Sequence, residues 1–282
     1  MFAEYKPYSL KIKNIPYSIT RPQVMGILNT TDDSFYDGGK YHTIDKALFR
    51  CEDMLHEGAD IIDIGGQSTR PGADIITENE ETRRTAPVID AIIKRFPDCI
   101  ISIDTFRAAV ANHAVRAGAA IINDVSAGDD DEDMVKTVSR LQVPYIAMHK
   151  KGLPKTMQDQ PHYENVLQEV KLYLENKLRI FHHAGIEDIV LDPGFGFGKT
   201  LDDNYHLLKH LDVFHTLNCP ILVGVSRKSM VWKLLATEPS KALNGSTALH
   251  MLALAKGAHF LRVHDVKEAV DCVKIAEEMY KV

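Results

Sequence analysis

The feature that most constrains the fold of this chain is a short apolar run that recurs eight times, usually with a polar residue at its end. Segments with helical spacing of apolar residues, or polar loops that contain glycine, lie between the runs. Short runs that are apolar on both faces are typical of parallel strands covered on both sides. The eight expected strands cover residues 24–28, 61–64, 100–103, 121–122, 144–148, 189–191, 221–225 and 260–263.

Eight strands alternating with helices over 282 residues predict an α/β fold, a single-domain (β/α)8 TIM barrel. The alternative is an open doubly wound sheet. No GxGxxG opens the first helix, and eight even units favour closure. The N-terminal residues alternate weakly and contain two prolines, which predicts a short hairpin. We therefore expect a hairpin over residues 1–20 that caps a barrel over residues 21–282.

The helices are expected to follow most of the strands. Thr43 is predicted as the N-cap of the first helix, and Thr77 with Glu80 predicts a capping box at the second. The acidic run 129–133 is interpreted as a solvated loop leading into a helix N-terminus, where negative charge is favourable, rather than as a metal site. Further helices are expected over 107–117, 163–184 and 267–280.

The overall charge limits the partners. Net charge is −6, from 33 basic and 39 acidic residues, which argues against nucleic acid or an anionic membrane as the main partner. There is no apolar stretch of about 18 residues, so no transmembrane helix is expected. The first residues lack the apolar segment of a signal peptide, and the four cysteines are scattered without CxxC pairing. These features favour a cytoplasmic protein with reduced thiols that acts on small molecules.

Polar residues stand at the ends of the predicted strands. In a barrel these ends form one face, where active sites lie. Any single one of them is as readily a turn former or a helix N-cap, but together they converge on one mouth. The residues are Asn29, Asp63, Asp104, Asn123, His149, Asp192, Lys228, Arg262 and His264.

The chemistry of these residues is of two kinds. The acceptors Asp104, Asn123 and Asp192 suit a flat heterocycle with several N–H donors. Cationic or potentially cationic groups suit a phosphorylated or carboxylated ligand, and these are Arg70, Lys228, Arg262 and His264. The residues alone therefore predict a nitrogen-rich ring joined to an anionic group.

Eight blocks of sequence, in the same order along the chain, resemble the signatures of dihydropteroate synthases. The resemblance runs from about residue 23 to residue 275, and eight ordered blocks are far more specific than any single motif. The blocks are Met25-Gly26-Ile27-Leu28-Asn29 with Asp33-Ser34-Phe35, Asp63-Ile64-Gly65-Gly66 with Ser68-Thr69-Arg70-Pro71-Gly72, Ser102-Ile103-Asp104-Thr105, Ile122-Asn123-Asp124, Met148-His149, Asp192-Pro193-Gly194-Phe195, Ser226-Arg227-Lys228-Ser229 and Arg262-Val263-His264-Asp265.

The resemblance implies a transferase of folate synthesis that joins p-aminobenzoate to hydroxymethyl-dihydropterin pyrophosphate. Residues implied to bind the pterin are Asp104, Asn123, Asp192, Lys228, Met148 and Arg262. Those implied for the pyrophosphate are Asn29, Arg70, Arg262 and His264, with a magnesium ion near Asn29. Those implied for p-aminobenzoate are Thr69, Ser229, Phe35 and Lys228. The catalytic set implied is Asp104, Lys228, Asn29, Arg262 and His264.

The same resemblance implies a homodimer and sulfonamide binding at the p-aminobenzoate site. It also implies that alanine at Lys228 removes most turnover, whereas alanine at Lys199 removes much less. The sequence departs from the family in its first loop, where Thr31-Asp32 stands in place of the usual Thr-Pro, and at Gln67, where glutamate is usual.

Two other functions remain open at this point. A pterin-dependent methyltransferase would use a similar barrel and similar acceptors, but would not need the cations at the mouth. A catalytically silent pterin-binding protein is favoured only by the change at Asp32.

Overall fold

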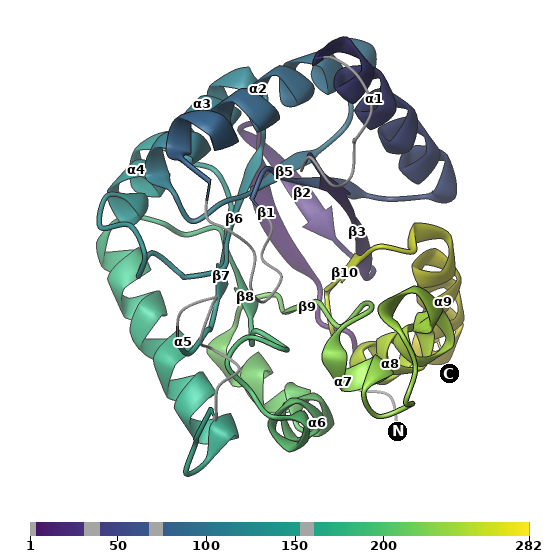
Figure 1. The fold of residues 1–282 in the computed structure, drawn as a ribbon. Coiled ribbons are helices and arrows are strands. Elements are labelled where there is room, and N and C mark those ends of the chain that lie inside the picture. Colours follow the sequence, from purple (N-terminus) through teal and green to yellow (C-terminus); the bar gives the residue numbers. More distant parts are fainter. Residues whose placement is uncertain (1–3, 31–39, 68–75, 153–160, 282) are drawn as a thin grey trace.

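The computed structural model describes residues 4–30, 40–67, 76–152 and 161–281. Eight parallel strands form a ring with helices outside it (Figure 1). The strands are β3 (Gln23–Asn29), β4 (Ile61–Gly65), β5 (Ile101–Asp104), β6 (Ile121–Asp124), β7 (Tyr145–Met148), β8 (Ile189–Asp192), β9 (Leu222–Val223) and β10 (Phe260–Val263).

The strand order shows that the sheet is a barrel and not an open doubly wound sheet. The order is β8-β7-β6-β5-β4-β3-β10-β9, so β3 to β8 follow one another in chain order, and β10, beside β9, pairs with β3. A parallel bridge between Leu191 and Ile221 joins the two ends of this list. The predicted TIM barrel is confirmed, with β9 shorter than the expected run.

The helices lie outside the ring, and all but the last, α9, connect successive strands. They are α1 (Lys40–Glu57), α2 (Glu78–Arg95), α3 (Ala108–Ala117), α4 (Met134–Leu141), α5 (Val166–His183), α6 (Leu201–Lys209), α7 (Ser229–Trp232), α8 (Leu243–Ala255) and α9 (Val266–Tyr280). Short 3-10 turns, η2 (Leu211–Leu217) and η3 (Pro239–Lys241), follow α6 and α7. Among the described residues, no helix is both long and apolar enough to cross a membrane.

Helix ends depart from the sequence-based expectations at two places. Helix α1 already begins at Lys40, so Thr43 lies inside it and is not its N-cap. Thr77 caps α2 by accepting a hydrogen bond from the Glu80 amide at 3.3 Å. The Glu80 carboxylate, however, binds Arg83 and Arg84, each at 2.7 Å. The predicted capping box is thus only half formed, because two arginines one turn later compete for the carboxylate.

The acidic run 129–133 ties elements together and is more than a solvated loop. Asp131 accepts a hydrogen bond from the Ala108 amide at 2.8 Å, which satisfies a donor in the first turn of α3. Asp129 pairs with Lys177 of α5. In the part of the chain that the structure describes, no group of three or more His, Cys, Asp or Glu residues could hold a metal.

A hairpin lies against the N-terminal ends of the barrel strands. It consists of β1 (Tyr8–Ile12) and β2 (Ile15–Ile19), joined through Lys13 and Asn14, which have φ of 50° and 63° as a tight hairpin turn requires. Its apolar side chains form one buried cluster with inward-facing residues of the barrel, and that cluster is Leu10, Ile12, Ile19, Met25, Ile61, Ala120, Ile121, Ile146, Val190, Leu222 and Phe260.

Alternation along each strand decides which side chains line the barrel. In β4, Ile62 and Ile64 pack in the cluster shared with the surrounding helices, while Ile61 lies in the interior cluster. Asp63, two residues after Ile61, therefore points inward as well. Apolar side chains fill the N-terminal half of the interior, and the polar ones gather at the C-terminal ends of the strands.

Candidate active site

Arg262 of β10 is the centre of a charge network at the mouth of the barrel. Its Nε donates to Asp63 Oδ2 at 2.6 Å, and its Nη2 donates to Asp104 Oδ2 at 2.6 Å. Asn123 Nδ2 donates to the same Asp63 oxygen at 3.1 Å. Side chains from β4, β5, β6 and β10 are thereby held together, and these strands occupy successive or nearby places in the ring.

The network pairs its charges in a largely buried position. Asp63 is completely buried, and the Arg262 side chain is 20% exposed. Burial raises the pKa of Asp104 to about 7, against the opposing effect of Arg262. Burial acts to lower the pKa of Arg262, but Asp63 and Asp104 outweigh it and the pKa is raised. The guanidinium therefore stays charged, and its two carboxylate partners offset the cost of burying it.

Lys228 and Asp192 form a second charged group beside this network. Asp192 ends β8, and its Oδ1 accepts a hydrogen bond from the Gly194 amide at 2.7 Å. Burial raises the pKa of Asp192, with Lys228 opposing. Lys228 Nζ donates to the Phe195 carbonyl and lies 4.7 Å from the centre of the Phe197 ring, close enough for a cation–π interaction.

The protonation of Lys228 is sensitive to pH in the neutral range. Burial lowers its pKa to about 8, with Asp192 opposing that shift. Lys228 and Arg262 both lie beside Gly224, since a Cβ there would be 3.7 Å from Lys228 Nζ and 3.8 Å from Arg262 Cβ. The mouth thus combines buried acceptors with two directed cations.

Asn29 ends β3 next to Asp104. A Cβ placed on Gly65 would lie 3.6 Å from both Asn29 Oδ1 and Asp104 Oδ2, so the two oxygens flank the same point of the backbone. Amide and carboxylate oxygens are hard ligands of the kind that Mg²⁺ prefers. Because Mg²⁺ usually keeps several waters and takes substrate phosphates as ligands, a position with few protein oxygens fits it.

The remaining predicted residues have separate surroundings. His264 Nδ1 lies 3.2 Å from Ser226 Oγ, which also accepts the His264 amide at 3.2 Å. Met148 Cγ lies 3.2 Å from where a Cβ on Gly194 would stand. Ser229 is the first residue of α7. Three predicted residues, Phe35, Thr69 and Arg70, lie outside the described residues.

Two residues without a predicted substrate role take central positions, and one of them, Asp63, was expected only to lie at the mouth. Asp63 receives both Arg262 and Asn123. Its signal in the sequence is a carboxylate at an inward position of an otherwise apolar strand. Lys199 is 2% exposed, with its ammonium among the carbonyl oxygens of the loop after β8. No local pattern reveals its burial, because a lysine between glycine and threonine resembles an exposed loop residue.

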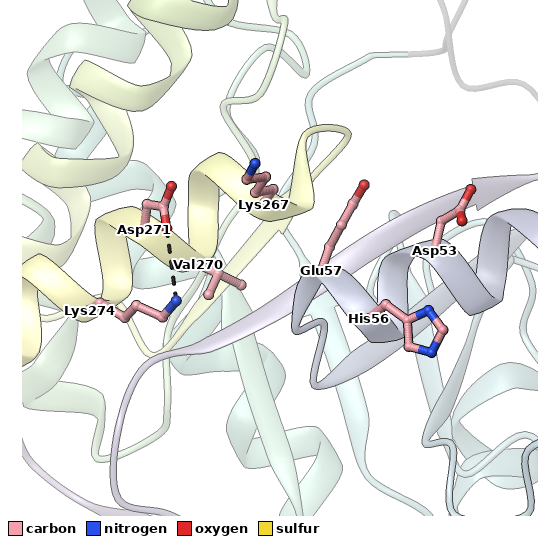
Figure 2. A pocket seen from close by; sticks show the side chains of 7 residues that line it. All are labelled: Asp53, His56, Glu57, Lys267, Val270, Asp271 and Lys274. Carbon is pink, nitrogen blue, oxygen red and sulfur yellow. Dashed lines mark ion pairs between the residues drawn. The ribbon is translucent and has the colours of Figure 1, made fainter.

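A cavity of about 420 Å³ lies elsewhere, between α1 and α9 on the outer wall (Figure 2). Its lining is mostly charged, and Lys274 is 3.9 Å from Asp271 across one helical turn. None of its residues belongs to the strand ends, so it is separate from the candidate site. The lining residues are Asp53, His56, Glu57, Lys267, Val270, Asp271 and Lys274.

A (β/α)8 barrel with buried acceptors and two cations at its mouth is typical of an enzyme that binds a nitrogen-rich, anionic substrate. The pterin-binding barrels are enzymes of this class. The family model for pterin binding enzymes matches residues 25–264. Dihydropteroate synthase of Haemophilus influenzae is 46% identical over 256 residues, covering 90% of this chain and 92% of that protein.

Two similar solved structures belong to the same family as the sequence relatives. Yersinia pestis dihydropteroate synthase with a sulfonamide drug complex has a TM-score of 0.90 and 42% identity, covering 97% of this chain and 99% of that one. The Xanthomonas albilineans synthase with 4-aminobenzoic acid has a TM-score of 0.91 and 40% identity, covering 98% of this chain and 100% of that one. The chain belongs to the dihydropteroate synthase family, whose members are transferases.

Proposed function

We propose that the chain condenses p-aminobenzoate with hydroxymethyl-dihydropterin pyrophosphate, giving dihydropteroate and pyrophosphate in folate biosynthesis. The observation that carries the proposal is the network of Arg262, Asp63, Asp104 and Asn123 beside Lys228. It offers several acceptors for the N–H groups of a pterin together with cations for its pyrophosphate. The complex of the Xanthomonas albilineans relative with 4-aminobenzoic acid supports the second substrate.

In this proposal the pterin lies over the strand ends. Asp104, Asn123 and Asp192 accept hydrogen bonds from its ring nitrogens, and burial makes each such bond stronger than in water. Lys228 donates to the ring, Arg262 lies against its face, and Met148 packs beside it.

The pyrophosphate is proposed to face Asn29, Arg70, Arg262 and His264. Asn29 would hold a magnesium ion together with water and pyrophosphate oxygens, and this ion supplies charge neutralisation for the leaving group. Arg262 would act on both substrate parts, and this is supported by its charge and by the two carboxylates that hold its plane.

The reaction breaks the bond between the pterin methylene carbon and the pyrophosphate oxygen, whose electron pair leaves with pyrophosphate. Asp104 and Asp192 stabilise positive charge on the pterin as that bond breaks. The amine nitrogen of p-aminobenzoate then bonds to the methylene carbon and loses a proton to water. The residues proposed to face p-aminobenzoate are Phe35, Thr69, Ser229 and Lys228.

The decisive assay is pyrophosphate release from the pterin ester with magnesium, with and without p-aminobenzoate. Release that depends on p-aminobenzoate and yields dihydropteroate is the expected result. Tight pterin binding without release would instead identify a silent pterin-binding protein. Methyl transfer from methyltetrahydrofolate, in place of pyrophosphate release, would identify a methyltransferase.

We also propose that the protein is a homodimer formed through α8 and α9. Helix α8 contains no Asp, Glu, Lys or Arg residue, and the apolar face of a helix is normally covered. Yet Leu252 of α8 is 54% exposed, and the neighbouring α9 exposes Ile275 and Met279. A second copy of the chain would cover these side chains.

Changing Leu252 to aspartate is expected to convert the dimer to a monomer, because a buried unpaired carboxylate is costly in an apolar interface. Sedimentation equilibrium at micromolar protein measures the change. Leu172→Asp on α5, where Leu172 is 56% exposed, is the matched control and should leave the mass unchanged. A monomeric wild type, or a dimeric Leu252→Asp variant, would contradict the proposed interface.

Three further properties of the protein are part of this proposal. The enzyme acts in the cytoplasm, residues 1–20 serve as a cap for the barrel over 21–282, and sulfonamides occupy the p-aminobenzoate site. The complex of the Yersinia pestis relative supports the last statement. Inhibition by a sulfonamide that is not competitive with p-aminobenzoate would contradict it.

A further inference from the structure

We infer that Lys199 is a positioning residue for the reaction, which acts by holding the loop 193–198 so that this loop directs Lys228. The inference rests on the role proposed for Lys228. Lys199 lies in a loop after β8, while Lys228 follows β9, so the coupling passes between two segments of the mouth.

The Lys199 amine is surrounded by acceptors in a site closed to solvent. Its Nζ is 2.8 Å from the Gly194 carbonyl, 3.1 Å from the Phe197 carbonyl and 2.9 Å from His149 Nδ1. The side chain is 2% exposed, and His149 is 5% exposed. One buried nitrogen therefore joins the start and the end of the loop to the residue that follows β7.

The arrangement is compatible with either protonation state of Lys199. Burial lowers its pKa, and burial together with Lys199 lowers the pKa of His149 to about 2, so the imidazole is neutral. An ammonium donates to both carbonyls and to His149 Nδ1. A neutral amine still donates to both carbonyls and accepts from His149 in its other tautomer.

The loop backbone lies very close to the backbone that follows β7. A Cβ on Gly194 would lie 1.8 Å from the His149 carbonyl oxygen, and one on Gly198 would lie 2.0 Å from the Lys151 carbonyl oxygen. Glycine is required at both points because the chains nearly touch. Polar contacts from Lys199 hold this part of the loop, in addition to the buried side chain of Phe195.

The segment between the two carbonyls held by Lys199 is the segment that contacts Lys228. The Phe195 carbonyl accepts from Lys228 Nζ, and the Phe197 ring lies 4.7 Å from that nitrogen. A Cβ on Gly196 would stand 3.2 Å from Lys228 Cδ. Movement of the loop would therefore displace both groups that direct the Lys228 ammonium.

Replacing Lys199 can separate a positioning role in the reaction from a purely structural role. Lys199→Met keeps the length of the side chain but leaves the buried Gly194 and Phe197 carbonyls without this donor, which costs only part of the free energy of unfolding of a domain. Lys199→Met is therefore expected to fold, but to release the loop. Lys199→Gln, which keeps N–H donors for the carbonyls, should lie between wild type and Lys199→Met. Lys209→Met, at an exposed position on α6, is the control.

The test is a double-mutant cycle in steady-state kinetics with the full-length protein. Lys199→Met should lower kcat/KM for the pterin ester by about 10-fold to 100-fold, since small displacements of a directing group are costly. It should add little to the loss caused by Lys228→Ala, because both changes remove the same directed ammonium. Thermal melts establish that each variant is folded.

The outcomes separate this inference from the role of Lys228. Wild-type kinetics for folded Lys199→Met, or a loss fully additive with that of Lys228→Ala, would overturn the inference alone. A fully active Lys228→Ala would instead overturn the role proposed for Lys228. If Lys199→Met does not fold, the same cycle with Lys199→Gln decides, and wild-type kinetics in that variant would overturn the inference.

Discussion

Lys228→Ala is expected to lower kcat/KM for the pterin ester by about 100-fold to 1,000-fold, the range seen when one directed donor is removed from a buried site. The change deletes the cation beside Asp192 and the contact with the Phe195 carbonyl. It leaves the Asp192 carboxylate buried without that compensation, which weakens pterin binding as well as turnover. Steady-state kinetics with the pterin ester and saturating p-aminobenzoate measure the loss.

The pH profile gives an independent check on Lys228. Its pKa is lowered to about 8, so the ammonium is present below that pH and is lost as the pH rises through it. Activity of the wild type should therefore fall above about pH 8. Lys228→Arg, if active, should move this limit upward because a guanidinium stays charged. Lys209→Ala is the control, and a Lys228→Ala enzyme with the control's activity would contradict the assignment.

Asp63→Asn is expected to lower kcat/KM by about 100-fold, because charge-assisted bonds contribute roughly 1.5–3 kcal/mol each. The substitution keeps the shape of the side chain but removes the negative charge that receives Arg262 Nε and Asn123 Nδ2. Within the described parts of the chain, Asp104 is then the one salt-bridge partner left to Arg262. Both the pterin and the pyrophosphate should bind more weakly.

Binding measurements separate the two consequences of the Asp63 change. Calorimetry with dihydropteroate reports the pterin contacts, and inhibition by added pyrophosphate reports the Arg262 contacts. Asp98→Asn, at an exposed position just before β5, is the matched control. If folded Asp63→Asn binds both ligands as the wild type does, Asp63 does not position Arg262.

The barrel was predictable because its signal repeats. A strand covered on both faces must be apolar throughout, so runs such as Ile61–Ile64 stand out from the amphipathic helices around them. The polar residues at the strand ends were predictable for the same reason, since each one ends an apolar run. Asp104, Asn123, Asp192 and Arg262 do lie at the C-terminal ends of their strands.

Local competition limited the prediction of helix ends. Thr77 caps α2 as expected, but the partner of Glu80 depends on which arginines its side chain can reach. The acidic run before α4 is similar, because Asp131 bonds to a helix start that lies 23 residues earlier in the chain. Such pairings have no local pattern, and only packing brings the partners together.

The sequence by itself determined the number of strands, the face on which polar residues gather and the family to which the chain belongs. These properties follow from residue type and spacing, which are local. Only the tertiary structure decided that Asp63 receives Arg262 from a strand 199 residues away and that Lys199 lies buried against His149. A side chain's partners depend on distances in space, and closing the barrel sets those distances by bringing the strand ends of the whole chain into one ring.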